Sequence, residues 1–199
     1  MGRTAAQNAK RRIELRAFVA SLKDAPCLDC GKSYEPFCMD FDHVGEKRSD
    51  ISSMVRNTYS LEAILREISK TELVCVICHR DRSYRRTRSK ESELSQNKYA
   101  IKTRKRLAEL RQIVYSAKSK PCVTCGASYD PWLMDLDHVD GAKVMHVAAM
   151  AGKNASKPDL VSEIAKCQVL CALCHRRKSS KDEIDRASLA RIPSPRATG

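Results

Sequence analysis

The sequence is poor in aromatic residues and has no long apolar segment. Aromatic side chains make up only 5% of the 199 residues, and there is a single tryptophan. No stretch approaches the roughly 18 consecutive apolar residues of a membrane-spanning helix. Residues 1–16 lack the apolar centre of a secretory signal peptide. These absences argue against a membrane or secreted protein and predict a cytoplasmic one.

Acidic residues are also scarce relative to basic ones. The chain has 37 Lys and Arg against 24 Asp and Glu, which gives a formal net charge of +13. This balance favours a polyanionic partner. The hydrophobic fraction of 42% is low for two packed cores. Small domains with few core residues usually need a further stabilising element, such as disulfides or a structural metal ion. In a reducing compartment, the 10 cysteines favour metal binding over disulfides.

The chain contains two copies of one pattern, about 95 residues apart. The segments at 27–31, 39–44 and 75–80 (CLDCG, MDFDHV and CVICHR) recur at 122–126, 134–139 and 171–176 (CVTCG, MDLDHV and CALCHR). Over residues 10–43 and 105–138, more than half of the aligned positions are identical. We therefore expect one small domain at 10–88 and a second at 105–184. Residues 89–104 are expected to form a basic connector, and residues 185–199 a disordered tail.

Each repeat is expected to mix short strands with helices. Apolar residues at Leu15, Phe18, Val19 and Leu22 follow helical spacing, and the second copy matches it. Strands are expected at 37–44, 72–75, 132–139 and 168–171, and helices at 61–68 and 160–164. A polar helix is expected to follow from His79 and from His175. The fold class predicted is α+β.

Paired cysteines predict one zinc site in each repeat. A C-x2-C turn directs two thiolates to one side of a tetrahedron, and two such turns complete a four-cysteine site. The first site is predicted at Cys27, Cys30, Cys75 and Cys78, and the second at Cys122, Cys125, Cys171 and Cys174. Buried thiols, disulfides or covalent haem attachment at C-x-x-C-H are the alternatives. Cys38 and Cys167 are not repeated, so we interpret them as small apolar side chains.

Histidines also recur at equivalent positions. Four of the 5 histidines form the two Asp-His pairs and the two Cys-His pairs, and only His146 is unmatched. A single histidine of this kind would most simply be a helix cap or a satisfied surface group. Duplication at both positions favours a functional role.

The combination of C-x2-C-G, D-H-V and C-x2-C-H-R resembles the HNH (His-Asn-His) endonucleases of the ββα-metal class, in the zinc-containing subtype common among phage and bacterial proteins. The resemblance covers both repeats. It implies two tandem copies of a small zinc-stapled ββα-metal (HNH) domain, each preceded by a basic amphipathic helix. In each copy a β-hairpin and the following helix would hold one catalytic divalent ion. The implied location is the cytoplasm of a bacterial or phage-infected host cell.

The resemblance also implies a role for each repeated histidine. His43 and His138 would be general bases, and the ligands of the catalytic ion, Mg²⁺ or another divalent ion, would be Asp42, His79, Asp137 and His175. A neutral imidazole accepts a proton from water near pH 7. A hard cation neutralises the phosphate and the leaving group. The implied products carry a 5′-phosphate and a 3′-hydroxyl.

Two features beside these residues need an interpretation. Lys70 and Lys166 occupy the position where the family has its middle Asn. Asp40 and Asp135 share a strand face with the predicted aspartate ligands, because side chains alternate along a strand. They either orient the site or only face solvent, and we expect the second.

Basic residues follow both terminal histidines and are predicted to bind DNA. They are Arg80, Arg82, Arg85, Arg86, Arg176, Arg177 and Lys178. Beside a phosphate-cleaving site, they would contact phosphates of double-stranded DNA with little sequence preference. Part of the set is expected to be no more than a solvated basic face.

The leading hypothesis is a monomeric, metal-dependent DNA endonuclease in which the two repeats act as an internal pseudo-dimer, each cutting one strand. A non-catalytic zinc-ribbon DNA-binding protein is the alternative from a different class. A third possibility is one active repeat beside one that only binds DNA.

Overall fold

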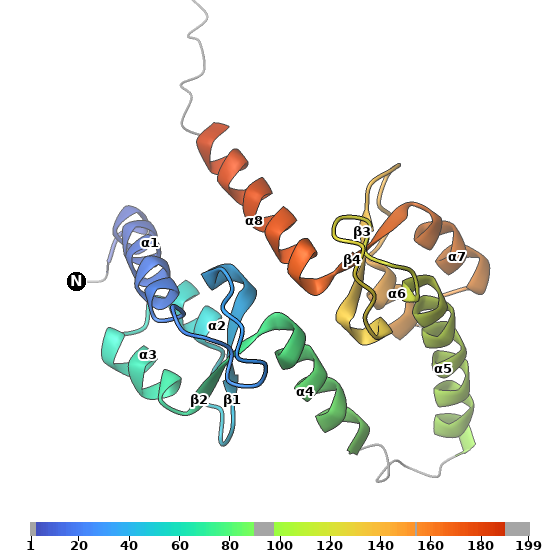
Figure 1. The fold of residues 1–199 in the computed structure, drawn as a ribbon, viewed down its shortest axis with the longest axis horizontal. Coiled ribbons are helices and arrows are strands. Elements are labelled where there is room, and N and C mark those ends of the chain that lie inside the picture. The colour runs from blue at the N-terminus through green and yellow to red at the C-terminus, as the bar shows by residue number, and fades with distance from the viewer. Residues whose placement is uncertain (1–2, 90–97, 154, 190–199) are drawn as a thin grey trace, which may run out of the picture. The chain divides into compact units, whose positions relative to one another are not determined.

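The structure of the chain, a computed structural model, describes residues 3–89, 98–153 and 155–189. The chain divides into two compact units, Met1–His79 and Arg80–Gly199. The division lies inside one helix, before the expected end of the first repeat at residue 88. Each unit mixes helices with a two-stranded antiparallel sheet, which confirms the α+β class (Figure 1).

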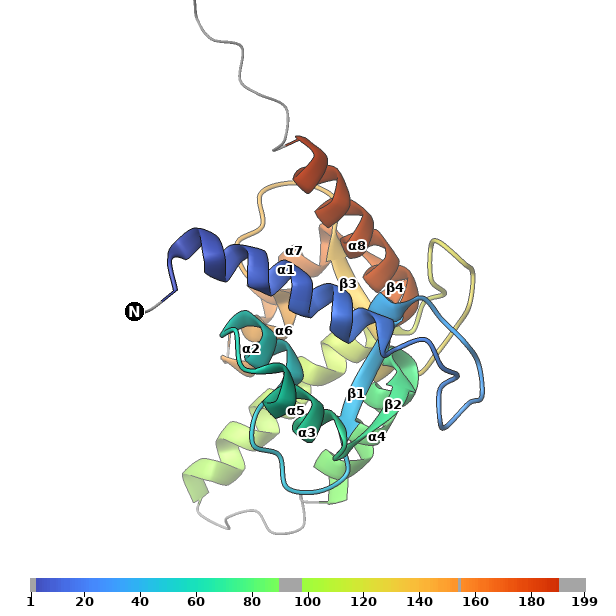
Figure 2. The same ribbon diagram turned by 90° about the vertical axis from the view of Figure 1, so that its left-hand side faces the viewer.

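The elements of the first unit follow one another in the expected order. They are α1 (Ala5–Ser21), the 3₁₀ turn η1 (Pro36–Cys38), β1 (Met39–His43), α2 (Ile51–Arg56), α3 (Leu61–Ile68), β2 (Thr71–Cys75) and the start of α4 (Val76–Ser89). The β1–β2 pair lies beside the helices α1, α2 and α3 (Figure 2).

The second unit repeats this order. Its elements are the rest of α4, then α5 (Lys98–Lys118), η3 (Pro131–Leu133), β3 (Met134–His138), α6 (Val147–Gly152), α7 (Lys157–Ala165), β4 (Cys167–Cys171) and α8 (Ala172–Leu189). Equivalent serines begin α3 and α7. The Ser60 hydroxyl accepts a hydrogen bond from the amide of Ala63, and the Ser156 hydroxyl accepts one from the amide of Asp159. Each bond satisfies one amide that the first turn leaves unpaired.

The two hairpins have corresponding registers. In the first, Asp42 lies opposite Glu72. In the second, Asp137 lies opposite Gln168. Since side chains alternate across a strand, Asp42 and the following His43 project from opposite faces of the sheet. At the end of the strand, His43 therefore meets Glu67, whereas Asp42 meets His79.

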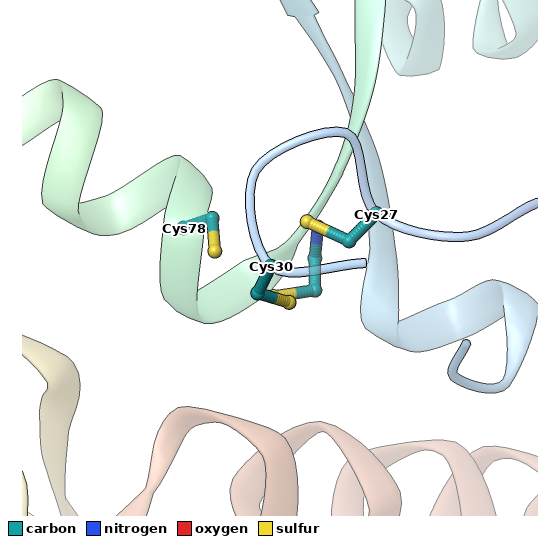
Figure 3. A group of neighbouring side chains, drawn as sticks. Cys27, Cys30 and Cys78 are labelled. Carbon is teal, nitrogen blue, oxygen red and sulfur yellow. The ribbon is translucent and has the colours of Figure 1, made fainter. Parts of the chain in front are cut away.

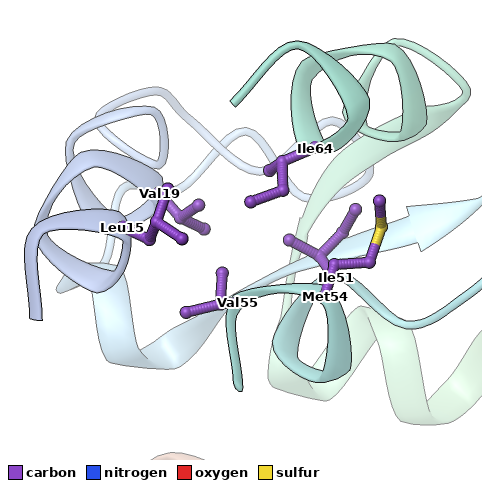
Figure 4. Close-up of a cluster of buried hydrophobic side chains, with 6 residues drawn as sticks. All are labelled: Leu15, Val19, Ile51, Met54, Val55 and Ile64. Carbon is purple, nitrogen blue, oxygen red and sulfur yellow. The ribbon is translucent and has the colours of Figure 1, made fainter. Parts of the chain in front are cut away.

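Both units have a small apolar core of the same construction. Six residues from α1, α2 and α3 form the first core, namely Leu15, Val19, Ile51, Met54, Val55 and Ile64 (Figure 4). The second core consists of Leu110, Val114, Val147, Met150, Ala151 and Leu160. On the predicted apolar face of the first leading helix, Leu15 and Val19 are buried and Phe18 packs against the core, whereas Leu22, just after the last residue of the helix, is 36% exposed. Helices α2 and α6 were not expected, because six residues are too few to show a helical period.

Several boundaries differ from those expected. Helices α4 and α8 begin three residues before His79 and His175, at the residue that follows each β-strand. Helix α5 begins at Lys98, inside the expected connector, and α8 continues to Leu189, inside the expected tail. The remainder of that tail and residues 90–97 lie outside the described residues. Among the residues described, no helix has the length and apolar character needed to cross a membrane.

Candidate functional site

The first predicted zinc site assembles from three separate segments. Cys27 and Cys30 lie on the turn after α1, Cys75 ends β2, and Cys78 lies in the first turn of α4 (Figure 3). One ligand atom from each of the four lies within 4.8 Å of the others. The Sγ atoms of Cys30 and Cys75 are 4.0 Å apart. The site therefore joins the leading turn, the hairpin and the following helix.

The second site, formed by Cys122, Cys125, Cys171 and Cys174, is equivalent. Its Cys125 and Cys171 Sγ atoms are 3.8 Å apart. A tetrahedral zinc ion with Zn–S bonds of ~2.3 Å places its sulfur ligands about 3.8 Å from one another. Both clusters thus fit one structural zinc ion each, and the prediction of two four-cysteine sites is confirmed. The eight cysteines of the two clusters form no disulfide, so the disulfide alternative is not supported for them.

The leading turns direct their sulfurs inward through local backbone geometry. Gly31 and Gly126 adopt φ values of 68° and 72°, a region that glycine enters without steric cost. Each amide donates to the carbonyl of the first cysteine of its pair, at 2.8 Å in both units. Burial raises the pKa of Cys27, but backbone amides including that of Cys75 outweigh it and lower the pKa to about 7. A thiolate at this position is the form that a metal ion binds.

The two unrepeated cysteines lie outside the clusters. Cys38 is fully buried. Cys167 packs against the second core, and its thiol donates to the Glu163 carbonyl at 3.4 Å. Neither belongs to a metal-binding group among the described residues. Both remain interpreted as small core side chains.

An aspartate–histidine cluster lies on the face of the first hairpin that carries Asp40 and Asp42, next to α4. His79, from α4, places Nδ1 at 3.0 Å from Asp40 Oδ2 and Nε2 at 3.4 Å from Asp42 Oδ1. When Nδ1 donates its hydrogen to Asp40, the lone pair of Nε2 faces an oxygen of Asp42. Two electron-pair donors that converge in this way suit a shared cation, and a carboxylate on the second ring nitrogen is typical around metal-binding histidines. Asp40 therefore does more than face solvent, and that expectation was wrong.

The second unit holds the equivalent cluster. His175 Nδ1 lies 2.8 Å from Asp135 Oδ2, and Nε2 lies 3.8 Å from Asp137 Oδ1. Asp137 also accepts hydrogen bonds from Lys178 at 2.6 Å and from Gln168 at 2.8 Å. The hydrogen bond to Asp135 raises the pKa of His175, against the opposing effect of burial.

Asp135 has a second partner, a guanidinium, in the same unit. Arg80 donates to both of its carboxylate oxygens at 2.9 Å. Burial raises the pKa of Asp135, but the hydrogen bonds from His175 and Arg80 outweigh it and hold that pKa well below its ordinary value. Asp135, like Asp40, thus binds the terminal histidine instead of only facing solvent.

The predicted bases bind a glutamate that the sequence reasoning missed. His43 Nε2 is 3.0 Å from Glu67 Oε1, and His138 Nε2 is 2.8 Å from Glu163 Oε1. Both glutamates come from the helix before the second strand and are only 2% exposed. A glutamate three residues before each lysine at the family's Asn position was the available signal. In the sequence, such a pair cannot be distinguished from an ordinary i, i+3 ion pair on a helix surface.

The predicted DNA-binding residues lie along α4 and α8, and the structure ties some of them to carboxylates. Arg80 and Lys178 bind the aspartates described above, and Arg85 pairs with Asp81 at 2.8 Å. The other residues of the predicted set are Arg82, Arg86, Arg176 and Arg177. Within the second unit, α4 and α5 also border a groove of about 950 Å³ whose lining includes Arg88, Arg104 and Arg111.

Comparison with protein-family models, with curated proteins and with solved structures finds no match to this chain. The assignment of a function therefore depends on the geometry of these residues.

Proposed function

We propose that the chain is a metal-dependent DNA endonuclease of the HNH type, with one active site in each unit. The observation that carries the proposal is the convergence of Asp42 Oδ1 and His79 Nε2 at 3.4 Å beside a four-cysteine cluster. The same types of residue meet in the second unit, at Asp137 and His175. One carboxylate and one imidazole are a suitable partial ligand set for a divalent ion that keeps waters in its remaining positions.

The chain's own residues supply the proton chemistry. His43 or His138 takes a proton from a water molecule, whose oxygen forms a bond to phosphorus as the bond from phosphorus to the 3′ oxygen breaks. The departing oxygen takes a proton from solvent, which leaves a 5′-phosphate and a 3′-hydroxyl. When bound at Asp42 and His79, or at Asp137 and His175, the divalent ion supplies neutralisation of the phosphate and of the leaving oxygen.

The proposed substrate is double-stranded DNA. The net charge of +13 and the basic residues of α4 and α8 suit a phosphate backbone. A chain with two active units would cut both strands as a monomer. Binding through phosphates would weaken steeply as salt rises and would depend little on sequence.

Nicking of supercoiled plasmid in Mg²⁺ or Mn²⁺ tests the proposal. We expect the wild type to linearise the plasmid, His43→Ala and His138→Ala each to leave nicked circles, and the double variant to be inactive. His146→Ala serves as the matched control, since this histidine has no counterpart in the other repeat. A double variant as active as the wild type would overturn the assignment of the bases. A single variant that still cuts both strands would overturn the division of one strand per unit.

A second candidate is a zinc-stabilised DNA-binding protein without catalysis, favoured by the second unit. There Lys178 binds Asp137, the carboxylate that the nuclease proposal needs for an ion, and Arg80 binds Asp135, the partner of His175. Retained zinc and DNA binding with no nicking in Mg²⁺, Mn²⁺ or Ni²⁺ would establish this candidate and remove the first.

A further inference from the structure

A buried glutamate contacts the proposed base in both units. In the first, Glu67 Oε1 lies 3.0 Å from His43 Nε2 and also accepts a hydrogen bond from the amide of Arg48 at 2.8 Å. Its other oxygen accepts from Lys70 Nζ at 3.0 Å. Burial disfavours a charged carboxylate, yet these donors outweigh it and lower the pKa of Glu67 to about 2. The group is therefore an anion that bridges His43 and Lys70.

The second unit builds the same bridge from a different sequence. Glu163 Oε1 lies 2.8 Å from His138 Nε2 and 3.0 Å from the amide of Val144, and Oε2 lies 2.8 Å from Lys166 Nζ. The loops between the first strand and the following helix differ in length and sequence. The histidine, glutamate and lysine nevertheless meet at nearly the same distances. The arrangement thus does not depend on one loop conformation.

We propose that Glu67 and Glu163 are positioning residues that hold His43 and His138 with Nδ1 as the atom that accepts the proton of the attacking water. The inference rests on the proposed nuclease function. A carboxylate is only an acceptor, so Nε2 must carry the hydrogen of a neutral imidazole in this contact. The lone pair is then on Nδ1, and the carboxylate stabilises the imidazolium that forms when Nδ1 takes the proton.

The lysines at the family's Asn position acquire a role in this arrangement. Lys70 and Lys166 bind the glutamate oxygen that the histidine does not use. Each lysine fixes the carboxylate plane and partly balances its buried charge, so that a full anion persists beside the imidazole. The lysine at the family's Asn position and the buried glutamate therefore belong to one hydrogen-bonded group with the histidine.

The test is the double variant Glu67→Gln/Glu163→Gln, compared with Glu62→Gln. Glutamine retains the shape and one acceptor oxygen but removes the charge. Glu62 lies on the same helix as Glu67 and forms only an exposed ion pair with Arg66. We expect kcat for plasmid nicking to fall roughly 10²- to 10⁴-fold in the double variant. The KM for DNA and the zinc content should stay at wild-type values, and the control should match the wild type throughout.

A second measurement does not depend on activity. Imidazole ¹⁵N spectra of the zinc-loaded wild type, recorded at mildly alkaline pH, should show protonated Nε2 and unprotonated Nδ1 for His43 and His138. The double variant should show a mixture of tautomers. A protonated Nδ1 in the wild type would overturn the inference, even if the variant unfolds.

The kinetic outcomes separate this inference from the proposed function. If the wild type nicks DNA and the double variant has the same kcat, the positioning role is overturned but the proposed function is not. The variant could instead lose zinc and activity in proportion, while its zinc-loaded fraction keeps the wild-type kcat. The glutamates would then only stabilise the fold, and the positioning role would again be overturned. A wild type without nicking in any divalent ion overturns the proposed function, and the base assignment with it.

Discussion

The two units preserve the same scaffold but differ on the face of the hairpin that carries the aspartates. Opposite Asp42, the first unit has Glu72, whereas opposite Asp137 the second has Gln168. The glutamine donates to Asp137 at 2.8 Å, which a carboxylate at the same position has no hydrogen to do. The zinc cluster, the core and the histidine–glutamate pair are common to both. The two units have thus kept the residues that stabilise the fold, whereas the hairpin face that carries the aspartates has diverged.

The distance between the terminal histidine and its aspartate also differs between the units. In the second unit, His175 Nε2 lies 3.8 Å from Asp137 Oδ1. The corresponding distance in the first unit is 3.4 Å. About 3 Å separates neighbouring ligands of an octahedral ion with bonds of ~2.1 Å. The first unit is thus closer to a divalent-ion site, and we expect its ion to bind more tightly.

Loss of one zinc ligand should have the largest effect and should show whether the units fold independently. Structural zinc stabilises small domains by an apparent ~10–16 kcal/mol, more than a small core supplies. We expect Cys75→Ser to unfold the first unit and Cys171→Ser the second, each with zinc falling from two ions to one per chain. Hydrogen exchange with zinc analysis measures both. Loss of protection in both units from either change would contradict independent folding.

Truncation of matched core residues should show that the two cores are energetically alike. Ile64 and Leu160 are both fully buried at equivalent positions of α3 and α7. Alanine at either position leaves a cavity, and we expect a loss of about 2–5 kcal/mol in the free energy of unfolding of that unit. Denaturant unfolding of the zinc-loaded chain measures the loss. The exposed Val161, changed to alanine, provides a control that should shift stability by less than about 0.5 kcal/mol.

Removal of Arg80 should affect the second unit only. Its guanidinium binds Asp135 through two charge-assisted hydrogen bonds, and the two side chains are 32% and 18% exposed. We expect Arg80→Ala to destabilise this unit by about 1–3 kcal/mol, because Asp135 loses a bidentate partner. Protection of amides in β3 and β4 against hydrogen exchange reports the change. Equal loss of protection in β1 and β2 would contradict an effect confined to the second unit.

Exchange of the residues opposite the aspartates should give the smallest change and tests the difference directly. Glu72→Gln should weaken Mn²⁺ binding at the first unit, and Gln168→Glu should strengthen it at the second, each by about tenfold, or ~1.4 kcal/mol. The reason is the loss or gain of a carboxylate directly across the strand pair. Titration of Mn²⁺ followed by electron paramagnetic resonance, with zinc already loaded, measures each site. Unchanged affinities would show that this position does not control ion binding.

Much of the scaffold was predictable because its signals are local. The cysteine pairs predicted both four-cysteine clusters, and the residue pattern predicted short strands at 37–44 and 72–75, close to the observed β1 and β2. The family resemblance implied that these strands form a hairpin. The terminal helices were expected too late because their first turn, which contains Cys78 or Cys174, reads as part of the metal motif. The site was only partly predictable. Asp40 was expected to face solvent, and Glu67 was missed, because its partner His43 is 24 residues away in the chain.

The order of residues alone determined that the chain has two repeats, which thiols gather in each, and which faces of the leading helices turn inward. These features follow from short spacings and from helical periodicity, which are properties of neighbouring residues. The tertiary structure decided which nitrogen of each histidine meets which carboxylate. That choice depends on how a strand face meets a helix that is distant in the chain, because burial makes an ionised side chain costly unless its hydrogen bonds are satisfied.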